Sequence, residues 1–265
     1  MKGVILAGGT GSRLYPLTKT ANKHMLPIYD KPMICYPLET MKEAGIDEIL
    51  IISGPGHAGQ FLELLGSGWD LDMSLQYTIQ EKPLGIAHAI WIAEDFADGE
   101  DIAVILGDNI IGDSFEEDVR NFDGGAKVFL NQVDEPERFG VAAVEDGSVT
   151  QIVEKPNDPP TDLAITGIYL YDNEVFDHVE KLELSDRNEL EVTDLNRIYL
   201  ENGNLDYRAF DGYWFDAGTI EGLYQANNRL REEKLNGNER GVQIEKTDWG
   251  RRGKEIMESA KQEEL

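Results

Sequence analysis

Residues 2–13 read KGVILAGGTGSR. The short apolar and β-branched run at residues 4–6 predicts a buried strand, and the glycines after it predict that the strand ends in a loop. Gly8, Gly9 and Gly11 let the backbone take positive φ and let a ligand approach the main chain closely. A concave row of backbone N–H groups, with Arg13 just beyond it, can hold a polyphosphate. We interpret this loop as a nucleotide site around which the chain is built.

Two well-known glycine motifs do not describe this loop. A Walker A loop ends in Gly-Lys-Ser/Thr, and no lysine stands here. The dinucleotide pattern G-x-G-x-x-G, started at Gly9, needs a glycine where the chain has Leu14. Taken alone, the loop therefore leaves open both the identity of its ligand and the alternative of a simple tight turn.

The composition favours a folded, acidic protein. The chain has 265 residues, enough for one large domain or two small ones, and its 41% hydrophobic content supports a sizeable core. The net charge is −27, from 51 acidic and 24 basic residues. Such a surface repels nucleic acid and anionic membranes, but a few cations gathered in a cleft can still bind a small phosphate compound. The acidic excess favours a halophilic protein, working in a cytoplasm of high salt that screens self-repulsion, over an ordinary acidic protein.

Cysteine and histidine usage predicts neither disulfides nor a zinc site. Cys35 is the single cysteine, so an intrachain disulfide is excluded, and the four histidines show no zinc spacing. The first apolar run is too short for a signal peptide, and no segment reaches the ~20 apolar residues that cross a bilayer. We expect a cytoplasmic protein.

The first half of the chain alternates apolar strands with helices. Apolar runs predict strands at 4–6, 47–53, 75–80 and 102–106, and helical periods predict helices over 32–44, 60–65 and 85–96. This order, with continuous apolar strands, predicts a parallel sheet covered on both sides. Ligands of such sheets collect at the carboxyl ends of the strands, where the glycine loop and Asp108 lie.

The second half predicts a further wall of mixed or antiparallel sheet. Strands are expected at 127–133, 141–144, 149–153, 164–171 and 205–210, with helices over 189–200 and up to about residue 234. We expect one domain over residues 1–236, with a nucleotide-binding half at 1–125 and a sugar-binding half at 126–236. Residues 237–265 form a polar tail.

A series of motifs carries a family resemblance over residues 1–230. In order they are GGTGSRL, NKHMLP, QEKPLGIAHA, LGDN, ERFG, EKP, TGIY and WFDAGT. Each is weak alone, but together they resemble the sugar-1-phosphate nucleotidyltransferases, closest to the glucose-1-phosphate thymidylyltransferases. The resemblance implies a Rossmann-like α/β fold whose mixed, mainly parallel sheet is sandwiched by helices, with a smaller sugar-binding β subregion. It also implies Mg²⁺-assisted transfer of a nucleoside monophosphate from dTTP or UTP to glucose 1-phosphate, releasing pyrophosphate.

The resemblance assigns roles that suit this reaction. Because both reactants are polyanions, catalysis is mainly positioning and charge neutralisation. The catalytic residues implied are Arg13, Lys23, Asp108 and Lys155, and the metal ligands are Asp108 and Asp216. The nucleotide site implied comprises Leu6, Gly8, Gly9, Gly11, Ser12, Arg13, Lys23, Gln80, Gly85 and Asp108. The sugar site implied comprises Asn109, Gly140, Glu154, Lys155 and the backbone of Ile165.

Chemistry supports these roles against simpler interpretations. Mg²⁺ is commonly held by one or two carboxylates plus substrate phosphates, whereas Asp108 and Asp216 could also merely cap the elements that follow them. The Gln80 amide can bond the N3–H and an adjacent carbonyl of thymine or uracil, and Gly85 lets the ring approach the backbone. The alternative for Gln80 is an exposed residue at a strand end.

The sequence departs from the family pattern at three places. His24 stands where related enzymes often carry glutamine, and Phe139 replaces a more usual tyrosine beside the sugar. The tail does not match the bacterial enzymes, so an effector site and the mode of assembly stay open. The resemblance implies a homo-oligomer, usually a tetramer, acting on small molecules only.

Three other functions are alternatives to thymidylyl transfer. A UTP-dependent uridylyltransferase for glycan assembly or protein glycosylation differs by the recognition of one methyl, worth only ~1 kcal/mol, so the choice of base stays open. A nicotinamide oxidoreductase would need a third glycine and an acidic end to the second strand, where Leu14 and Ser53 stand. A silent nucleotide-sugar sensor would be expected to lose the cations or the metal-binding acids, yet all are present.

Overall fold

Strand β1 (Lys2–Ala7) lies in the middle of the main sheet because apolar side chains cover both of its faces. The computed structural model describes residues 1–237, and in it Val4 and Leu6 pack into one hydrophobic core while Ile5 and Ala7 pack into a second. Successive side chains of a strand point to opposite faces. A strand whose residues 4–7 are all apolar and buried therefore requires helices on both sides of the sheet.

The other elements follow in chain order. The strands are β2 (Pro27–Ile28), β3 (Lys31–Pro32), β4 (Glu48–Ser53), β5 (Ser74–Ile79), β6 (Ile102–Leu106), β7 (Asn109–Ile111), β8 (Ala126–Gln132), β9 (Gly140–Glu145), β10 (Ser148–Glu154), β11 (Leu163–Tyr171), β12 (Leu205–Ala209) and β13 (Trp214–Asp216). The helices are α1 (Cys35–Glu43), α2 (Ala58–Leu65), α3 (Ile86–Trp91), α4 (Glu94–Ala97), α5 (Glu116–Arg120), α6 (Val175–Val179), α7 (Val192–Glu201) and α8 (Ile220–Leu235).

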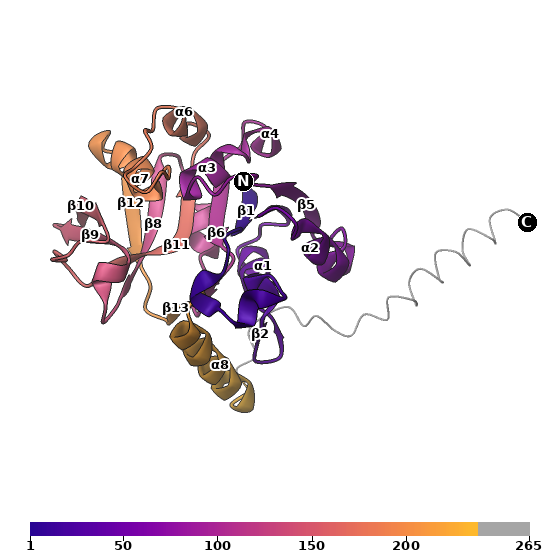
Figure 1. Cartoon of the computed structure of the whole chain (residues 1–265). Coiled ribbons are helices and arrows are strands. Elements are labelled where there is room, and N and C mark those ends of the chain that lie inside the picture. The colour runs from indigo at the N-terminus through magenta and orange to yellow at the C-terminus, as the bar shows by residue number, and fades with distance from the viewer. Residues whose placement is uncertain (238–265) are drawn as a thin grey trace, which may run out of the picture.

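The main sheet contains nine strands within residues 1–237 (Figure 1). Its order is β10-β9-β11-β6-β1-β4-β5, and β8 pairs with both β11 and β12. The strands β6, β1, β4 and β5 are parallel, whereas β11 runs antiparallel to β6, β8 and β9. The predicted mixed, mainly parallel sheet is thereby confirmed, and the expected second wall is a continuation of the same sheet.

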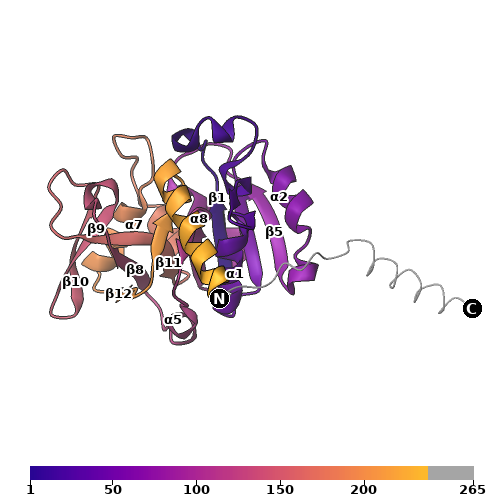
Figure 2. The same ribbon diagram turned by 90° about the horizontal axis from the view of Figure 1, so that it is seen from below.

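Helices cover the two faces of the sheet, as the sequence predicts. The first core packs against α3, α4, α6 and α7, and the second packs against α1, α2 and α5. Figures 1 and 2 show these two layers on opposite sides of the strands. Helix α8 belongs to a third, smaller cluster, in which Ala226 packs near Ile28, Ile110 and Ala217. Within residues 1–237, none of the helices combines the length and apolarity that crossing a membrane requires.

Two predicted helices differ most from the observed ones. The helix expected over 85–96 is divided into α3 and α4, because the backbone N–H of Ala93 bonds the carbonyl of Ile90, a tight 3₁₀ contact. The helix expected from residue 189 begins at Val192. Leu190 instead accepts from the N–H of Ala87 (3.2 Å) and donates to the carbonyl of Leu84 (2.7 Å), so it is held against the segment before α3. Of the predicted tail, all but Gly237 lies outside the described residues.

The carboxyl ends of the parallel strands meet at one edge of the sheet. The N–H of Gly107, after β6, donates to the carbonyl of Leu6 on β1 (2.9 Å), and the N–H of Gln80 donates to Ser53 at the end of β4 (2.8 Å). The short pair β7–β13, which the sequence did not predict, places Asp216 opposite Asn109. Segments from distant parts of the chain thus converge at this edge.

We expect the sheet core to dominate stability, so truncation of Ile5, which is fully buried, should be costly. The Ile5→Ala change should lower the free energy of unfolding by about 2–5 kcal/mol through lost burial and a residual cavity. Urea denaturation measures this loss. Leu62→Ala on α2, where the side chain is 56% exposed, is the control and should change stability by less than about 0.5 kcal/mol. Equal losses from the two changes would contradict this account of the core.

Candidate active site

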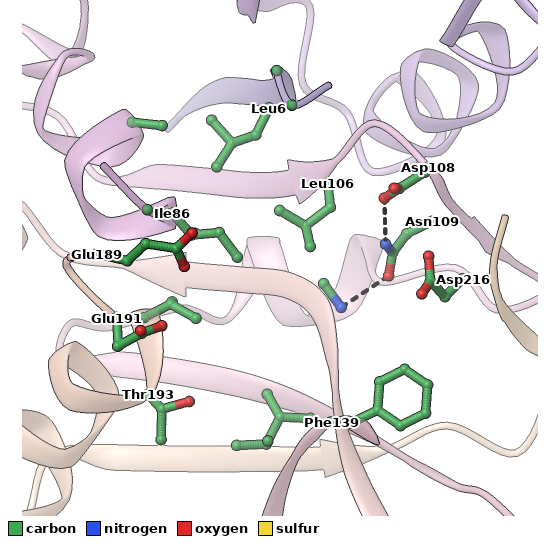
Figure 3. Close-up of a pocket in the computed structure, with 18 of the residues that line it drawn as sticks. Leu6, Ile86, Leu106, Asp108, Asn109, Phe139, Glu189, Glu191, Thr193 and Asp216 are labelled. Atoms are coloured by element: carbon green, nitrogen blue, oxygen red, sulfur yellow. Dashed lines mark hydrogen bonds between the residues drawn. The ribbon is translucent and has the colours of Figure 1, made fainter. Parts of the chain in front are cut away.

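A cavity of about 430 Å³ lies at the carboxyl edge of the parallel strands (Figure 3). Figure 3 shows Asp108, Asn109 and Asp216 gathered on one side of it, and Glu189, Glu191 and Thr193 on the other. Gly11 and Ser12 are the predicted site residues that do not line its wall. The predicted residues that do line it are Leu6, Gly8, Gly9, Arg13, Lys23, Gln80, Gly85, Asp108, Asn109, Gly140, Glu154, Lys155, Ile165 and Asp216.

The glycine loop has the backbone that its sequence predicts. Gly9 and Gly11 take φ values of 89° and 64°, and Gly11 leads into a 3₁₀ turn at Ser12–Leu14. Leu14 is fully buried, so it anchors the end of the loop in the core. The side chain of Arg13 remains 60% exposed and reaches Asp216, with 3.1 Å between Nη1 and Oδ2.

Lys23 and Asp108 form a largely buried ion pair. Lys23 Nζ lies 2.5 Å from Asp108 Oδ2, and the two side chains are 14% and 8% exposed. A 3₁₀ turn positions Lys23, and the Asn22 side chain caps this turn by accepting from the N–H of His24. Burial opposes ionisation of Asp108, but the Lys23 ammonium holds the pKa of Asp108 well below its usual range. The carboxylate is therefore charged at neutral pH.

Asp216 is the second carboxylate at this end of the cavity. Its Oδ1 accepts from the N–H of Gly218 (3.0 Å), and the N–H of Ala217 donates to the carbonyl of Asp108 (2.9 Å). Burial and repulsion by Asp108 both raise the pKa of Asp216. A further cation between the two acids would relieve that repulsion.

The donor set fits a hard divalent cation. A Cβ at Gly218 would lie 2.5 Å from Asp108 Oδ2, 2.9 Å from Asp216 Oδ1 and 3.1 Å from Arg13 Nη2, so glycine at this position lets the two carboxylates come close together. Residues 1–237 contain no group of three or more metal-ligating side chains, so the protein alone does not cage an ion. Two carboxylates completed by substrate phosphates are the arrangement that Mg²⁺ commonly uses.

Asn109 connects the two acids to the rest of the cavity. Its Oδ1 accepts from the N–H of Gly167 (2.9 Å) and from Trp214 Nε1 (2.5 Å), which fixes the orientation of the amide. Its Nδ2 donates to Asp108 Oδ1 (3.2 Å), as Figure 3 shows. One amide hydrogen remains for a ligand.

Glu154 is surrounded by donors in the part of the cavity formed by β9, β10 and the start of α7. Its Oε1 lies 2.9 Å from both Lys155 Nζ and Arg187 Nη2, and its Oε2 accepts from Thr193 Oγ1 at 2.6 Å. Burial opposes its ionisation, yet the donors Thr193 and Lys155 hold the pKa of Glu154 below its ordinary value. Lys155 itself has a φ of 40°, a left-handed backbone conformation that is uncommon for residues other than glycine.

Gln80 has both amide hydrogens engaged. Its Nε2 lies 3.0 Å from the carbonyl oxygen of Gly85 and 3.0 Å from His88 Nδ1. A Cβ built on Gly8 would lie 3.5 Å from Gln80 Oε1, so this oxygen faces the glycine loop. From the sequence, we expect this amide to bond both the N3–H and a carbonyl of the base. Only its accepting oxygen, Oε1, is left to face a base.

Four polar or aromatic residues among those that line the cavity have no role predicted from the sequence: Arg138, Arg187, Thr193 and Trp214. Arg138 and Trp214 lie inside the motifs ERFG and WFDAGT, which offered a signal. Arg187 is a lone cation in the acidic stretch LELSDRNELE, which was a weaker one. No sequence signal marked Thr193, because its contact with Glu154 depends on where β10 places that carboxylate.

The chain is similar to known proteins over most of its length. Residues 2–233 match the protein family described as nucleotidyl transferase. The low-salt glycan biosynthesis nucleotidyltransferase Agl11 of Haloferax volcanii is 44% identical over 239 residues, which cover 88% of this chain and 67% of the relative. The glucose-1-phosphate thymidylyltransferase of Neisseria meningitidis serogroup A is 46% identical over 233 residues, covering 85% of this chain and 81% of the relative.

Solved structures share the fold. A Bacillus anthracis protein assigned as a glucose-1-phosphate thymidylyltransferase, in complex with a sucrose, superimposes with a TM-score of 0.84 at 47% identity, covering 88% of this chain and 96% of the other. A UDP-glucose pyrophosphorylase in complex with UDP-glucose has a TM-score of 0.78 at 28% identity, covering 88% and 98%.

His24 is buried beside this site as a neutral ring. Its Nδ1 lies 2.7 Å from Asn22 Oδ1, and its Nε2 has no hydrogen-bond partner among the described residues. Burial, with a contribution from Lys23, lowers the pKa of His24 to about 3. His24 is therefore not one of the cations of the cavity at neutral pH.

The pKa of His24 predicts a loss of stability in mild acid. Between pH 6.5 and about 3 the unfolded chain binds a proton that the folded protein does not, so stability falls as the pH is lowered through this range. At pH 5.5 the loss from His24 should reach roughly 1.4 kcal/mol relative to pH 7.5. The His24→Gln protein should lack this component, as urea denaturation at the two pH values can measure. An unchanged pH dependence would show that His24 is not the titrating group.

Proposed function

Because the chain belongs to the nucleotidyl transferase family, we propose that it transfers the thymidylyl group of dTTP to glucose 1-phosphate, giving dTDP-glucose and pyrophosphate. The observation that carries this proposal is the layout of one cavity. Two cations and two carboxylates stand beside the glycine loop, and a carboxylate-centred cluster suited to hydroxyl groups lines the same cavity. The thymidylyltransferase named among the relatives supports the choice of substrates.

The reaction asks the protein for positioning and charge neutralisation. An oxygen of the sugar phosphate attacks the α-phosphorus of the nucleotide, a new P–O bond forms, and the bond to the bridging oxygen of pyrophosphate breaks in line. A phosphate monoester is already ionised near pH 7, so no protein base is needed. The backbone of the glycine loop would hold the triphosphate, Arg13 would neutralise the departing pyrophosphate, and Lys23 would contact the phosphates at the reacting end.

We assign Asp108 and Asp216 as the ligands of a Mg²⁺ ion. When bound, the ion would neutralise phosphate charge and polarise the reacting phosphorus. In this structure Lys23 and Arg13 form ion pairs with the same two carboxylates. On this assignment Lys23 and Arg13 would contact the substrate phosphates once the two carboxylates hold the metal ion.

The sugar would be bound by the opposite wall of the cavity. Glu154 would accept from sugar hydroxyls, since its charge is already stabilised by Thr193 and Arg187. The free amide hydrogen of Asn109 would reach a further hydroxyl, and Lys155 would contact the sugar phosphate. Gly140 and the backbone of Ile165 line the same wall. Residues 1–125 would thus hold the nucleotide, and 126–236 the sugar.

The composition and the family resemblance support three broader proposals. The net charge of −27 supports work in a cytoplasm of high salt. The family resemblance supports a homotetramer acting on small molecules. Neither nucleic acid nor an anionic membrane suits so acidic a surface.

UTP is the alternative nucleotide. Thymine and uracil present the same hydrogen-bonding edge and differ by one methyl, worth only ~1 kcal/mol in a pocket. The similar UDP-glucose pyrophosphorylase, solved with UDP-glucose, supports this alternative.

The most direct test offers dTTP, UTP, dCTP, GTP and ATP in turn with glucose 1-phosphate and measures released pyrophosphate. We expect release with dTTP, release with UTP within about tenfold of it, and at least ~100-fold less with the purine nucleotides, whose two-ring bases are larger than thymine or uracil. Release with a purine nucleotide alone would contradict the assignment of Gln80. Binding without release for every nucleotide would instead indicate a sensor.

The metal assignment predicts the effect of Asp108→Asn. An amide is a poor ligand for Mg²⁺ and leaves Lys23 without its buried counter-charge, so kcat should fall at least ~100-fold while dTTP still binds. Steady-state kinetics with a Mg²⁺ titration, together with calorimetric nucleotide binding, make the measurement. Asp118→Asn is the matched control, because Asp118 is 8% exposed and ion-paired with Lys127 and Arg208 far from the cavity, whereas Asp108 is 5% exposed. Full activity of the Asp108→Asn protein would remove Asp108 from the metal site.

A further inference from the structure

Gln80 is held by two acceptors from the beginning of one helix. Gln80 follows β5 and is 9% exposed, and its Nε2 bonds the Gly85 carbonyl oxygen and His88 Nδ1, each at 3.0 Å. Gly85 caps α3 and His88 lies within its first turn. Residues three apart on a helix share one face, so the two acceptors close on the amide nitrogen together.

The Gly85 carbonyl determines which end of the amide points outward. Gly85 takes a φ of 100°, and a Cβ there would lie 2.4 Å from the carbonyl oxygen of Leu190, so this backbone suits only glycine. Leu190 also bonds the backbone on both sides of Gly85, at Leu84 and Ala87. A carbonyl oxygen only accepts, so the group that faces it must be the NH₂ of Gln80.

The orientation of Gln80 in turn determines the tautomer of His88. Because the amide nitrogen only donates, His88 Nδ1 must be the unprotonated, accepting nitrogen of a neutral ring. Burial lowers the pKa of His88, which keeps the ring neutral near pH 7. The ring packs beside Trp91 with centroids 6.3 Å apart, so its position is supported by the helix.

The arrangement leaves Gln80 Oε1 as the only group of this amide that can face a base, because both hydrogens are used. Thymine and uracil carry a hydrogen on N3 that such an oxygen accepts. Cytosine has an unprotonated N3 that repels it and an amino group where the others have a carbonyl. We propose that His88 is a positioning residue that, through Gln80, makes the base subsite an acceptor and so excludes cytidine nucleotides. This inference rests on the proposed function.

Variants of His88 separate this role from simple packing. His88→Ala frees one amide hydrogen and leaves Gln80 held only by the Gly85 carbonyl. His88→Asn places an amide oxygen near the position of Nδ1 and restores an acceptor. The kinetic constants for dTTP and dCTP are measured with glucose 1-phosphate for the wild type and both variants. Thermal unfolding of each protein checks that it is folded.

We expect the wild type to prefer dTTP over dCTP by at least ~100-fold in kcat/KM. In His88→Ala this preference should fall about tenfold, which is the effect of losing one hydrogen bond. The change should come from a higher KM for dTTP, while kcat stays within about twofold of the wild-type value. His88→Asn should recover most of the preference. An unchanged preference in His88→Ala, or equal losses in the two variants, would overturn the proposal.

The tautomer is tested without catalysis. ¹⁵N NMR of the folded wild type should show His88 with Nδ1 unprotonated and Nε2 protonated near pH 7. Protonation at Nδ1 would overturn the proposal even if every variant were inactive. A wild type that used neither dTTP nor UTP would contradict the proposed function, and the NMR result would still decide the role of His88.

Discussion

The ion pair between Lys23 and Asp108 is the interaction on which the site depends. Burying either charge alone would cost several kcal/mol, so the lysine turn and the end of β6 must meet for either to be tolerated. The same pairing resolves a conflict in the composition. A chain with a net charge of −27 repels phosphate compounds, but two cations against two buried acids produce a local region that polyanions can enter. The protein thus places two of its few cations, Arg13 and Lys23, beside the glycine loop.

The sheet supplies the rigid frame for this arrangement. Parallel strands end at one edge, where backbone N–H groups and carbonyls are not used by the sheet and are free to meet ligands. The glycine loop, Gln80 and Asp108 all follow such strand ends, and hydrogen bonds between neighbouring ends hold them in register. The antiparallel continuation through β11 and β9 then brings the wall that contains Gly140 and Ile165 to the same edge.

Fixed hydrogen-bond direction recurs at three places in the cavity. Asn109, Glu154 and Gln80 each have most of their bonding capacity used by the protein, so each presents a defined donor or acceptor to a ligand. Polar groups fixed in this way need little reorganisation when substrate arrives. The two nearby histidines have different surroundings: His24 is a buried, neutral ring beside Lys23, whereas His88 bonds the Gln80 amide.

Much of the fold was readable from local pattern. The apolar run at 102–106 matched β6 in both bounds, and the order of strands and helices predicted a sheet covered on both faces, because burial leaves its period in nearby residues. The family motifs likewise indicated most of the polar residues that line the cavity. Only the tertiary structure decided which of them meet. Asp216 reaches Asp108 through the β7–β13 pair, Arg187 and Thr193 reach Glu154 across separate elements, and both hydrogens of Gln80 are used by groups on α3. These contacts depend on long-range chain packing and on the direction of single hydrogen bonds, and neither leaves a period in the sequence.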